Sequence, residues 1–246
     1  MRQNKVSKFA LATAVVVGSS LAASASASFV VFEQNFANPG SSGLPLDNFG
    51  WQAHWDADAT AYPTNITAGN PNISSSPGFG GVKGFLFHPG NLNNTQPHIW
   101  WTETSIGPVE DLDTFSFASA NVRGLDQTAN PVDFVQVALR VDGEWYVSQE
   151  AFATPVGNNW SPHLLDFDTA LFYELDFTPG VSLAETAPST PAVLPPTSTV
   201  SALGLYNVSK DNAMRLDAVT VTAIPEPASI AALGLGGMVL LRRRHQ

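Results

Sequence analysis

VDFVQVALRVDGEWYVSQEA, residues 132–151, decides the fold class of this chain. From Val135 to Val141 apolar side chains occupy every second position, so an extended strand would have one apolar face. Asp142 and Gly143 then supply residues that accept positive φ in a tight type I′ turn, and residues 144–151 return as a second strand. The stretch therefore predicts a β-hairpin.

The rest of the chain repeats short apolar or alternating runs separated by Gly, Pro, Asn and Asp, and it contains no long amphipathic helix. About ten strands with such turn signals predict an all-β fold, a two-sheet antiparallel jelly-roll sandwich. Besides the hairpin, strands are expected at 29–32, 51–55, 84–88, 98–103, 113–121, 171–177, 200–207 and 214–222.

A Pro-rich segment, residues 184–198, interrupts this pattern and lacks the amide donors of a central strand. It suits either a linker or a loop. Residues 200–222 beyond it make only about two strands, which are not stable alone. We therefore predict one domain over residues 28–224, with 184–198 as a long loop.

The N-terminus has the layout of a secretory signal peptide. Basic residues at positions 2, 5 and 8 precede an apolar core at residues 9–21, and the small residues Ala25 and Ala27 mark a cleavage site. We predict export and removal of residues 1–27 by signal peptidase.

The C-terminus, residues 225–246, combines a short motif, an apolar run from Ala228 to Leu241 and a basic stop. As a helix these 14 residues reach ~21 Å, against a hydrocarbon core of roughly 30 Å, so a lasting anchor is expected to be longer. The basic stop should stay cytoplasmic by the positive-inside rule. The motif and stop residues are Pro225, Glu226, Pro227, Arg242, Arg243 and Arg244.

This tail resembles the PEP-CTERM sorting signal of Gram-negative bacteria. The resemblance implies recognition by an exosortase, transient tethering in the inner membrane, removal of the tail, and delivery to the cell surface or to the extracellular matrix of a biofilm. The alternative is an ordinary C-terminal anchor that stays attached.

Charge and cysteine content limit the functions open to the body between these two signals. Residues 28–224 hold five basic and 20 acidic side chains, a net charge of −15. Such a surface disfavours nucleic acid and anionic membranes. The chain has no cysteine, which excludes disulfides, thiolate metal sites and a cysteine nucleophile.

Two local stretches of the body resemble known jelly rolls. Residues 32–36, FEQNF, followed by Gly50 and Trp51, resemble the start of concanavalin-like jelly rolls. Residues 215–221, RLDAVTV, resemble the last strand of that family and of galactose-binding-like domains. These stretches do not choose between the two topologies.

Tryptophans are the best functional signal in the body. Adjacent Trp100 and Trp101 must point to opposite faces of a strand, so the tryptophans cannot all enter one core. Exposed rings near Asn and Asp suit sugar stacking, whereas the alternative is packing in the core or under loops. The candidate carbohydrate-binding residues are Trp51, Trp55, Trp100 and Trp101.

Catalytic and metal signals are weaker. Residues 174–179, ELDFTP, approach the Glu-x-Asp-x-x-Glu strand of glycosidases, but Pro179 replaces the acid. The four body histidines show no zinc spacing and no Gly-x-Ser-x-Gly elbow occurs. Asp166 and Asp168 are the choice for a structural Ca²⁺, against the alternative of solvated acids.

Together these features predict an exported, non-catalytic surface or matrix protein that binds exopolysaccharide. The alternatives are an extracellular polysaccharide-degrading enzyme and a purely structural or adhesive module.

Overall fold

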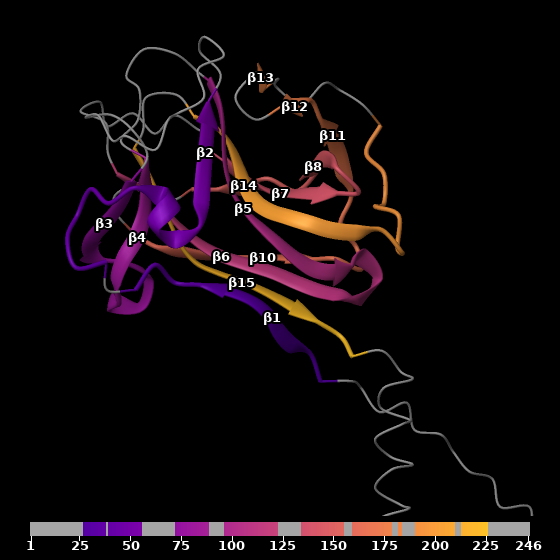
Figure 1. The fold of residues 1–246 in the computed structure, drawn as a ribbon, viewed down its shortest axis with the longest axis horizontal. Coiled ribbons are helices and arrows are strands. Elements are labelled where there is room, and N and C mark those ends of the chain that lie inside the picture. The colour runs from indigo at the N-terminus through magenta and orange to yellow at the C-terminus, as the bar shows by residue number, and fades with distance from the viewer. Residues whose placement is uncertain are drawn as a thin grey trace, which may run out of the picture.

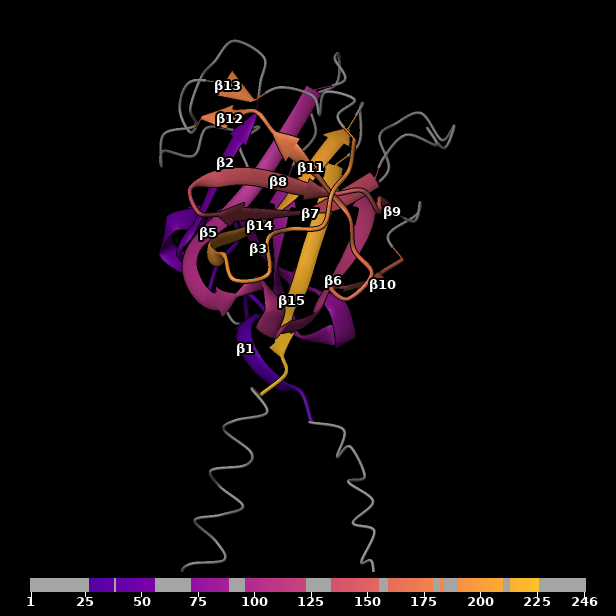
Figure 2. The same cartoon turned by 90° about the vertical axis from the view of Figure 1, so that its right-hand side faces the viewer.

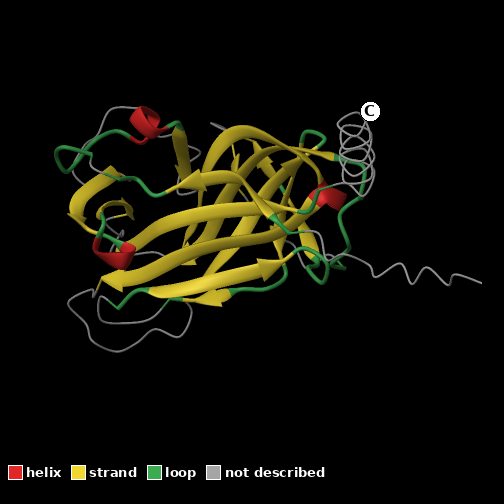
Figure 3. Ribbon diagram, turned by 90° about the horizontal axis from the view of Figure 1, so that it is seen from below, coloured by secondary structure: helices red, strands yellow, loops and turns green. Residues whose placement is uncertain are grey.

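The computed structural model describes residues 27–37, 39–55, 72–88, 96–122, 134–154, 159–178, 182–183, 190–209 and 213–225. Two antiparallel sheets stack as the predicted jelly-roll sandwich, and short 3-10 helices η1 (Leu46–Phe49), η2 (Phe79–Gly81) and η3 (Val109–Asp111) connect strands (Figures 1 and 3).

The first sheet has the order β10-β6-β15-β4-β3, with β1 also pairing with β15. Its strands are β1 (Phe29–Gln34), β3 (Asn72–Pro77), β4 (Lys83–His88), β6 (Leu112–Val122), β10 (Ser161–Asp166) and β15 (Ala213–Ala223). We call it the six-stranded sheet.

The second sheet has the order β11-β8-β7-β14-β5-β2, with β9 also pairing with β7. Its strands are β2 (Trp51–Trp55), β5 (Gln96–Pro108), β7 (Phe134–Val141), β8 (Glu144–Ser148), β9 (Phe152–Ala153), β11 (Phe172–Leu175) and β14 (Thr199–Ser209). We call it the seven-stranded sheet. A separate pair, β12 (Phe177–Thr178) and β13 (Ser182–Leu183), lies near β11 and β8 (Figure 2).

The predicted hairpin is confirmed as β7 and β8, which pair from Ala138 with Val147 to Val141 with Glu144. Asp142 and Gly143 have φ of 50° and 96°, the positive values that the turn requires. The turn of the hairpin is also held by a residue outside the hairpin, because the Asp142 carboxylate accepts a hydrogen bond from the Thr199 amide at 3.1 Å.

The core lies between the two sheets. It takes alternate residues of β7 and β14, among them Val137 and Leu203, and alternate residues of β6 and β15, among them Phe115 and Leu216. All four side chains are fully buried. Burial of such side chains is worth about 1.5–3 kcal/mol each, so this apolar layer is the main source of stability.

β14 and β15 follow the Pro-rich segment, and both occupy interior positions. β14 lies between β5 and β7, and β15 pairs with β6, β4 and β1. Residues 190–198 form no strand and touch the sandwich through a bridge from Ala192 to Phe172.

Four strands were missing from the sequence prediction: the two-residue strands β9 and β13, and the longer strands β3 and β10. β3 reads NISSSP and β10 reads SPHLLD, so each has few apolar residues and contains a proline. Both lie at edges of the six-stranded sheet, where polar residues and proline are tolerated.

β1 and the end of β15 lie side by side, with Phe29 opposite Ala223, so the described chain enters and leaves the sandwich at one pole (Figure 2). The predicted signal peptide up to residue 26 and the tail from Glu226 onward lie outside the described residues. No helix within the described ranges is long and apolar enough to cross a membrane.

Candidate functional site

The outer face of the seven-stranded sheet carries a second apolar cluster, separate from the core between the sheets. It forms because strand alternation that sends Trp100 and Leu205 inward sends Trp101 and Tyr206 outward. Its members are Ile99, Trp101, Ala138, Trp145, Val147, Leu175, Phe177, Ala202 and Tyr206. We call it the outer cluster.

Phe177 of β12 lies over the middle of the outer cluster. Its ring centroid is 5.2 Å from those of both Trp101 and Trp145, and 5.3 Å from that of His54. The tilted and edge-on arrangements are those that aromatic pairs prefer. Phe177 therefore shields the two tryptophan rings from solvent.

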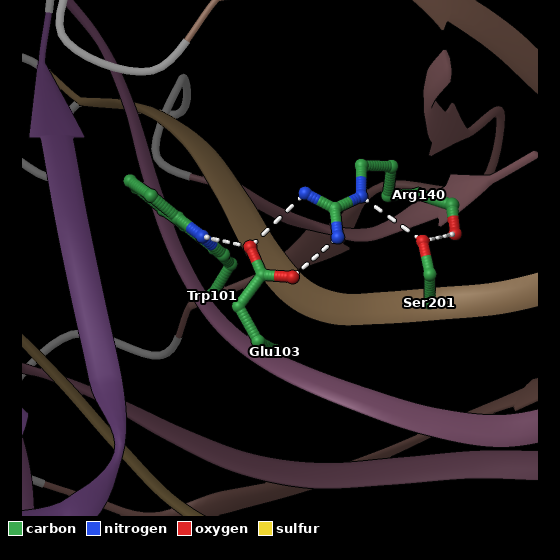
Figure 4. A network of polar contacts seen from close by, with 4 residues as sticks. All are labelled: Trp101, Glu103, Arg140 and Ser201. Atoms are coloured by element: carbon green, nitrogen blue, oxygen red, sulfur yellow. Dashed lines mark hydrogen bonds and ion pairs between the residues drawn. The ribbon is translucent and has the colours of Figure 1, made fainter. Parts of the chain in front are cut away.

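A polar network borders the outer cluster where the face opens to solvent (Figure 4). Arg140 of β7 donates from Nη1 and Nη2 to the two carboxylate oxygens of Glu103 on β5, and from Nε to Ser201 Oγ at 3.0 Å. Trp101 Nε1 donates to Glu103 Oε1 at 3.3 Å. The Arg140 guanidinium carbon lies 5.8 Å from the centre of the Trp145 ring.

The network is pre-ordered yet accessible. Bidentate pairing fixes both Arg140 and Glu103, whose side chains remain 25% and 46% exposed. The site thus offers a carboxylate, a guanidinium and a hydroxyl beside aromatic rings, a set that can both donate to and accept from the hydroxyl groups of a ligand. The network contains one carboxylate, whereas glycoside hydrolysis uses two.

The sequence predicted an exposed platform of tryptophan rings. For the three of these tryptophans whose side chains are described, that exposure is wrong. Trp51 and Trp100 are 1% exposed and pack in the core between the sheets, and Trp101 is 3% exposed in the outer cluster. The opposite orientation of Trp100 and Trp101 is confirmed. The sequence could not show that β12 covers the face to which Trp101 points. The side chain of Trp55 lies outside the described residues.

Asp166 and Asp168 lie at the end of β10 and in the turn after it. Asp166 Oδ1 accepts a hydrogen bond from the Asp168 amide at 2.9 Å, which closes this turn. In the ranges that the structure covers, no group of three or more His, Asp or Glu side chains is placed to hold a metal.

The residues of the glycosidase-like stretch do not converge. Glu174 and Asp176 are exposed and alternate with Tyr173, Leu175 and Phe177, which pack on the outer cluster. Pro179 lies outside the described residues.

The fold brings one serine into hydrogen-bond contact with one histidine, and no local sequence motif predicts this contact. Ser119 Oγ lies 2.7 Å from His163 Nε2, across the register of β6 and β10. Ser119 is fully buried, and the His163 ring lies against Phe117 and Phe152. Burial lowers the pKa of His163. The contact is part-buried, and Ser119 itself has no exposed surface.

Asp217 is a second buried polar group that the sequence did not single out. It is 1% exposed and accepts hydrogen bonds from the Phe79 amide at 2.8 Å and the Ala218 amide at 2.7 Å. Burial raises the pKa of its carboxyl to about 6, although both amides act to lower it. Asp217 also packs closely against the backbone of Gly78, since a Cβ on Gly78 would lie 2.2 Å from Asp217 Oδ2.

Comparison with known proteins gives similarity in structure only. No family model matches the chain, and no curated protein matches it. Among solved structures it is similar to the family 11 carbohydrate-binding module of the cellulosomal cellulase Lic26A-Cel5E of Clostridium thermocellum, with a TM-score of 0.41, 12% identity, and coverage of 77% of this chain and 94% of that one.

Two further solved structures are similar at the same level. The K3 adhesin domain of Lys-gingipain from Porphyromonas gingivalis has a TM-score of 0.40 and 15% identity, covering 80% of this chain and 99% of that chain. The α-L-arabinofuranosidase MgGH51 has a TM-score of 0.46 and 8% identity, covering 79% of this chain and 27% of that chain. At such low identities and TM-scores, we draw no conclusion about function or ligand from these three structures.

Proposed function

We propose that this chain is an exported, non-catalytic protein that binds polysaccharide through the polar network on the outer face of the seven-stranded sheet. Glu103 and Ser201 supply acceptors and Arg140 supplies donors for sugar hydroxyl groups. The observation that carries the proposal is the pre-ordered yet exposed pair of Arg140 and Glu103 beside the Trp145 ring.

Export and sorting form the other half of the proposal. The N-terminal signal would direct the chain across the inner membrane, and the tail that begins with Pro225, Glu226 and Pro227 would be removed by an exosortase. The body would then lie at the cell surface or in the extracellular matrix, where exopolysaccharide is the abundant ligand. Glu226→Gln should leave full-length protein in the envelope, as read by mass spectrometry, and unchanged maturation would contradict the sorting step.

Binding is tested by affinity electrophoresis of the full chain, purified in detergent, in gels that contain β-glucan, xylan, galactan or dextran. We expect retardation by at least one of these neutral polymers. Glu103→Gln and Arg140→Gln should each weaken binding by about 10- to 150-fold, since the loss of one hydrogen bond to a charged group is worth about 1.5–3 kcal/mol.

Matched controls are Glu110→Gln, an exposed acid in η3, and Lys83→Gln, an exposed cation of the six-stranded sheet. Both should bind like the wild type. The proposal fails if no polymer retards the protein, or if the network variants migrate like the controls. Release of reducing sugar from a bound polymer would instead indicate an enzyme.

A further inference from the structure

The outer face of the six-stranded sheet holds an arginine in an aromatic setting. Arg215 of β15 alternates with Met214 and Leu216, which enter the core, so its side chain points outward. Its guanidinium carbon lies 5.1 Å from the centre of the Phe85 ring. This stacking is a cation–π contact, which orients the planar guanidinium.

Further rings lie next to Phe85 on this face. Phe87 lies directly opposite Arg215 in the pairing of β4 with β15, and its ring is 6.3 Å from that of Phe85. Trp160, which precedes β10, lies 5.7 Å from Phe85, and Phe79 of η2 lies 6.4 Å from Trp160. Phe85 is buried, whereas Phe79, Phe87 and Trp160 are each partly exposed. Trp160 is thus a tryptophan with an accessible surface.

Arg215 has no charged partner among the described residues, where the Arg140–Glu103 pair is the one ion pair. Its Nε is buried and has no hydrogen-bond partner. Asp217, two residues along β15, is occupied by the backbone amides of Phe79 and Ala218. An unpaired arginine is unexpected in a body with four acids for each base, because a buried or half-buried cation is normally paired.

We propose that Arg215, with Phe87 and Trp160, forms a second binding site that takes an anionic sugar, its carboxylate or sulfate group on Arg215 and its ring against Trp160. Since Nε is buried, the ligand is bound end-on through Nη1 and Nη2, the paired donors that match two anion oxygens. This site rests on the proposed function only for the class of ligand, a polysaccharide. Its residues are separate, because Arg215 and the Arg140–Glu103 network lie on different sheets.

The negative charge of the body explains why an acidic ligand would need a cationic site. With a net charge of −15, residues 28–224 repel polyanions in general, so binding to an acidic polymer requires a local cationic site. Among the body cations that are described, Arg140 is already neutralised by Glu103, and Lys83 is exposed. Arg215 alone among these three combines an unpaired guanidinium with aromatic rings.

The test is calorimetric titration of the full chain in detergent with oligogalacturonate, with its carboxyl-reduced form as the neutral comparison. Dextran sulfate against dextran distinguishes a sulfate ligand from a carboxylate ligand. We expect binding to at least one acidic probe, a loss of tenfold or more in Arg215→Gln, and a smaller loss in Arg215→Lys, which keeps the charge but not the planar fork. Lys83→Gln, which also removes one positive charge from the six-stranded sheet, serves as the matched control and should bind the acidic probe like the wild type.

Several results would overturn the site: no binding to either acidic probe, unchanged affinity in Arg215→Gln, a loss in Arg215→Gln that is equally large for the neutral comparison polymers, or equal affinity for poly-glutamate, which would indicate a peptide ligand. The thermal midpoint of Arg215→Gln is measured alongside, and Trp160→Phe, which keeps an aromatic ring, should also weaken binding if that variant's midpoint is unchanged. Failure here leaves the neutral-polymer experiment on Glu103 unaffected, so the two proposals can fail independently.

Discussion

Replacing Asp217 by asparagine should change how the stability of the protein depends on pH. The carboxyl pKa is 3.8 in its ordinary setting and about 6 in the folded protein. At pH values between these two pKa values, Asp217 is more often protonated in the folded state than in the unfolded state. The free energy of unfolding therefore rises as the pH falls through this range. At neutral pH the ionised, buried carboxylate therefore destabilises the fold.

The magnitude follows from the shift of about two pKa units, at about 1.4 kcal/mol each. Between pH 7 and pH 4 the wild type should gain about 2–3 kcal/mol from Asp217, a gain that Asp217→Asn lacks. The variant also has a loss that does not depend on pH. Its single amide oxygen cannot replace both carboxylate oxygens, which accept from the Phe79 and Ala218 amides, and this costs about 1–3 kcal/mol.

The assay is urea unfolding followed by tryptophan fluorescence at pH 7, 6, 5 and 4, for both proteins in parallel. Subtracting the variant from the wild type at each pH cancels the other titrating groups. We expect the difference to grow in favour of the wild type as the pH falls. A difference that stays constant, or that shrinks on acidification, would refute the raised pKa.

Three further changes test the packing. Gly204→Ala should lower the free energy of unfolding by about 1–3 kcal/mol in urea, because the new Cβ would lie 2.2 Å from the Trp100 carbonyl oxygen; an unchanged midpoint would contradict this close approach. In the folded wild type the lowered pKa of His163 disfavours its protonation, so the free energy of unfolding should fall as the pH drops below about 6.5. His163→Gln should not show this fall, and equal pH profiles for the two proteins would contradict the burial of His163. Thr222→Val should cost about 1–3 kcal/mol in thermal unfolding, because Thr222 Oγ1 donates to Asp113 Oδ2 at 3.0 Å, and a neutral result would show that this bond contributes nothing.

The sandwich was predictable from the sequence where a strand is apolar on at least one face. The hairpin of β7 and β8, together with β2, β14 and β15, follows from alternation and from the Asp142-Gly143 turn, which are local properties. β3 and β10 were missed because an edge strand needs little apolar surface. Their assignment depends on neighbours that are distant in the chain.

The candidate sites were less predictable, because each depends on which strands become neighbours. Trp101 and Glu103 share one face by alternation, but nothing local places Arg140 beside them from β7. Alternation showed that Trp100 and Trp101 point to opposite faces, yet the sequence could not show that Phe177 would cover Trp101. Arg215 was visible as one of the few body cations, and only the pairing of β15 with β4 reveals its aromatic surroundings.

The position of β15 has a mechanical consequence. This strand ends at Ala223, immediately before the tail, and it is held on one edge by β6 and on the other by β4 and β1. Hydrogen bonds of antiparallel strands run perpendicular to the strand axis. Tension applied through the C-terminal end along β15 must therefore shear the bonds on both edges together, instead of peeling them one by one. The sandwich should therefore resist a pull along β15 at the end that leads into residues 225–246.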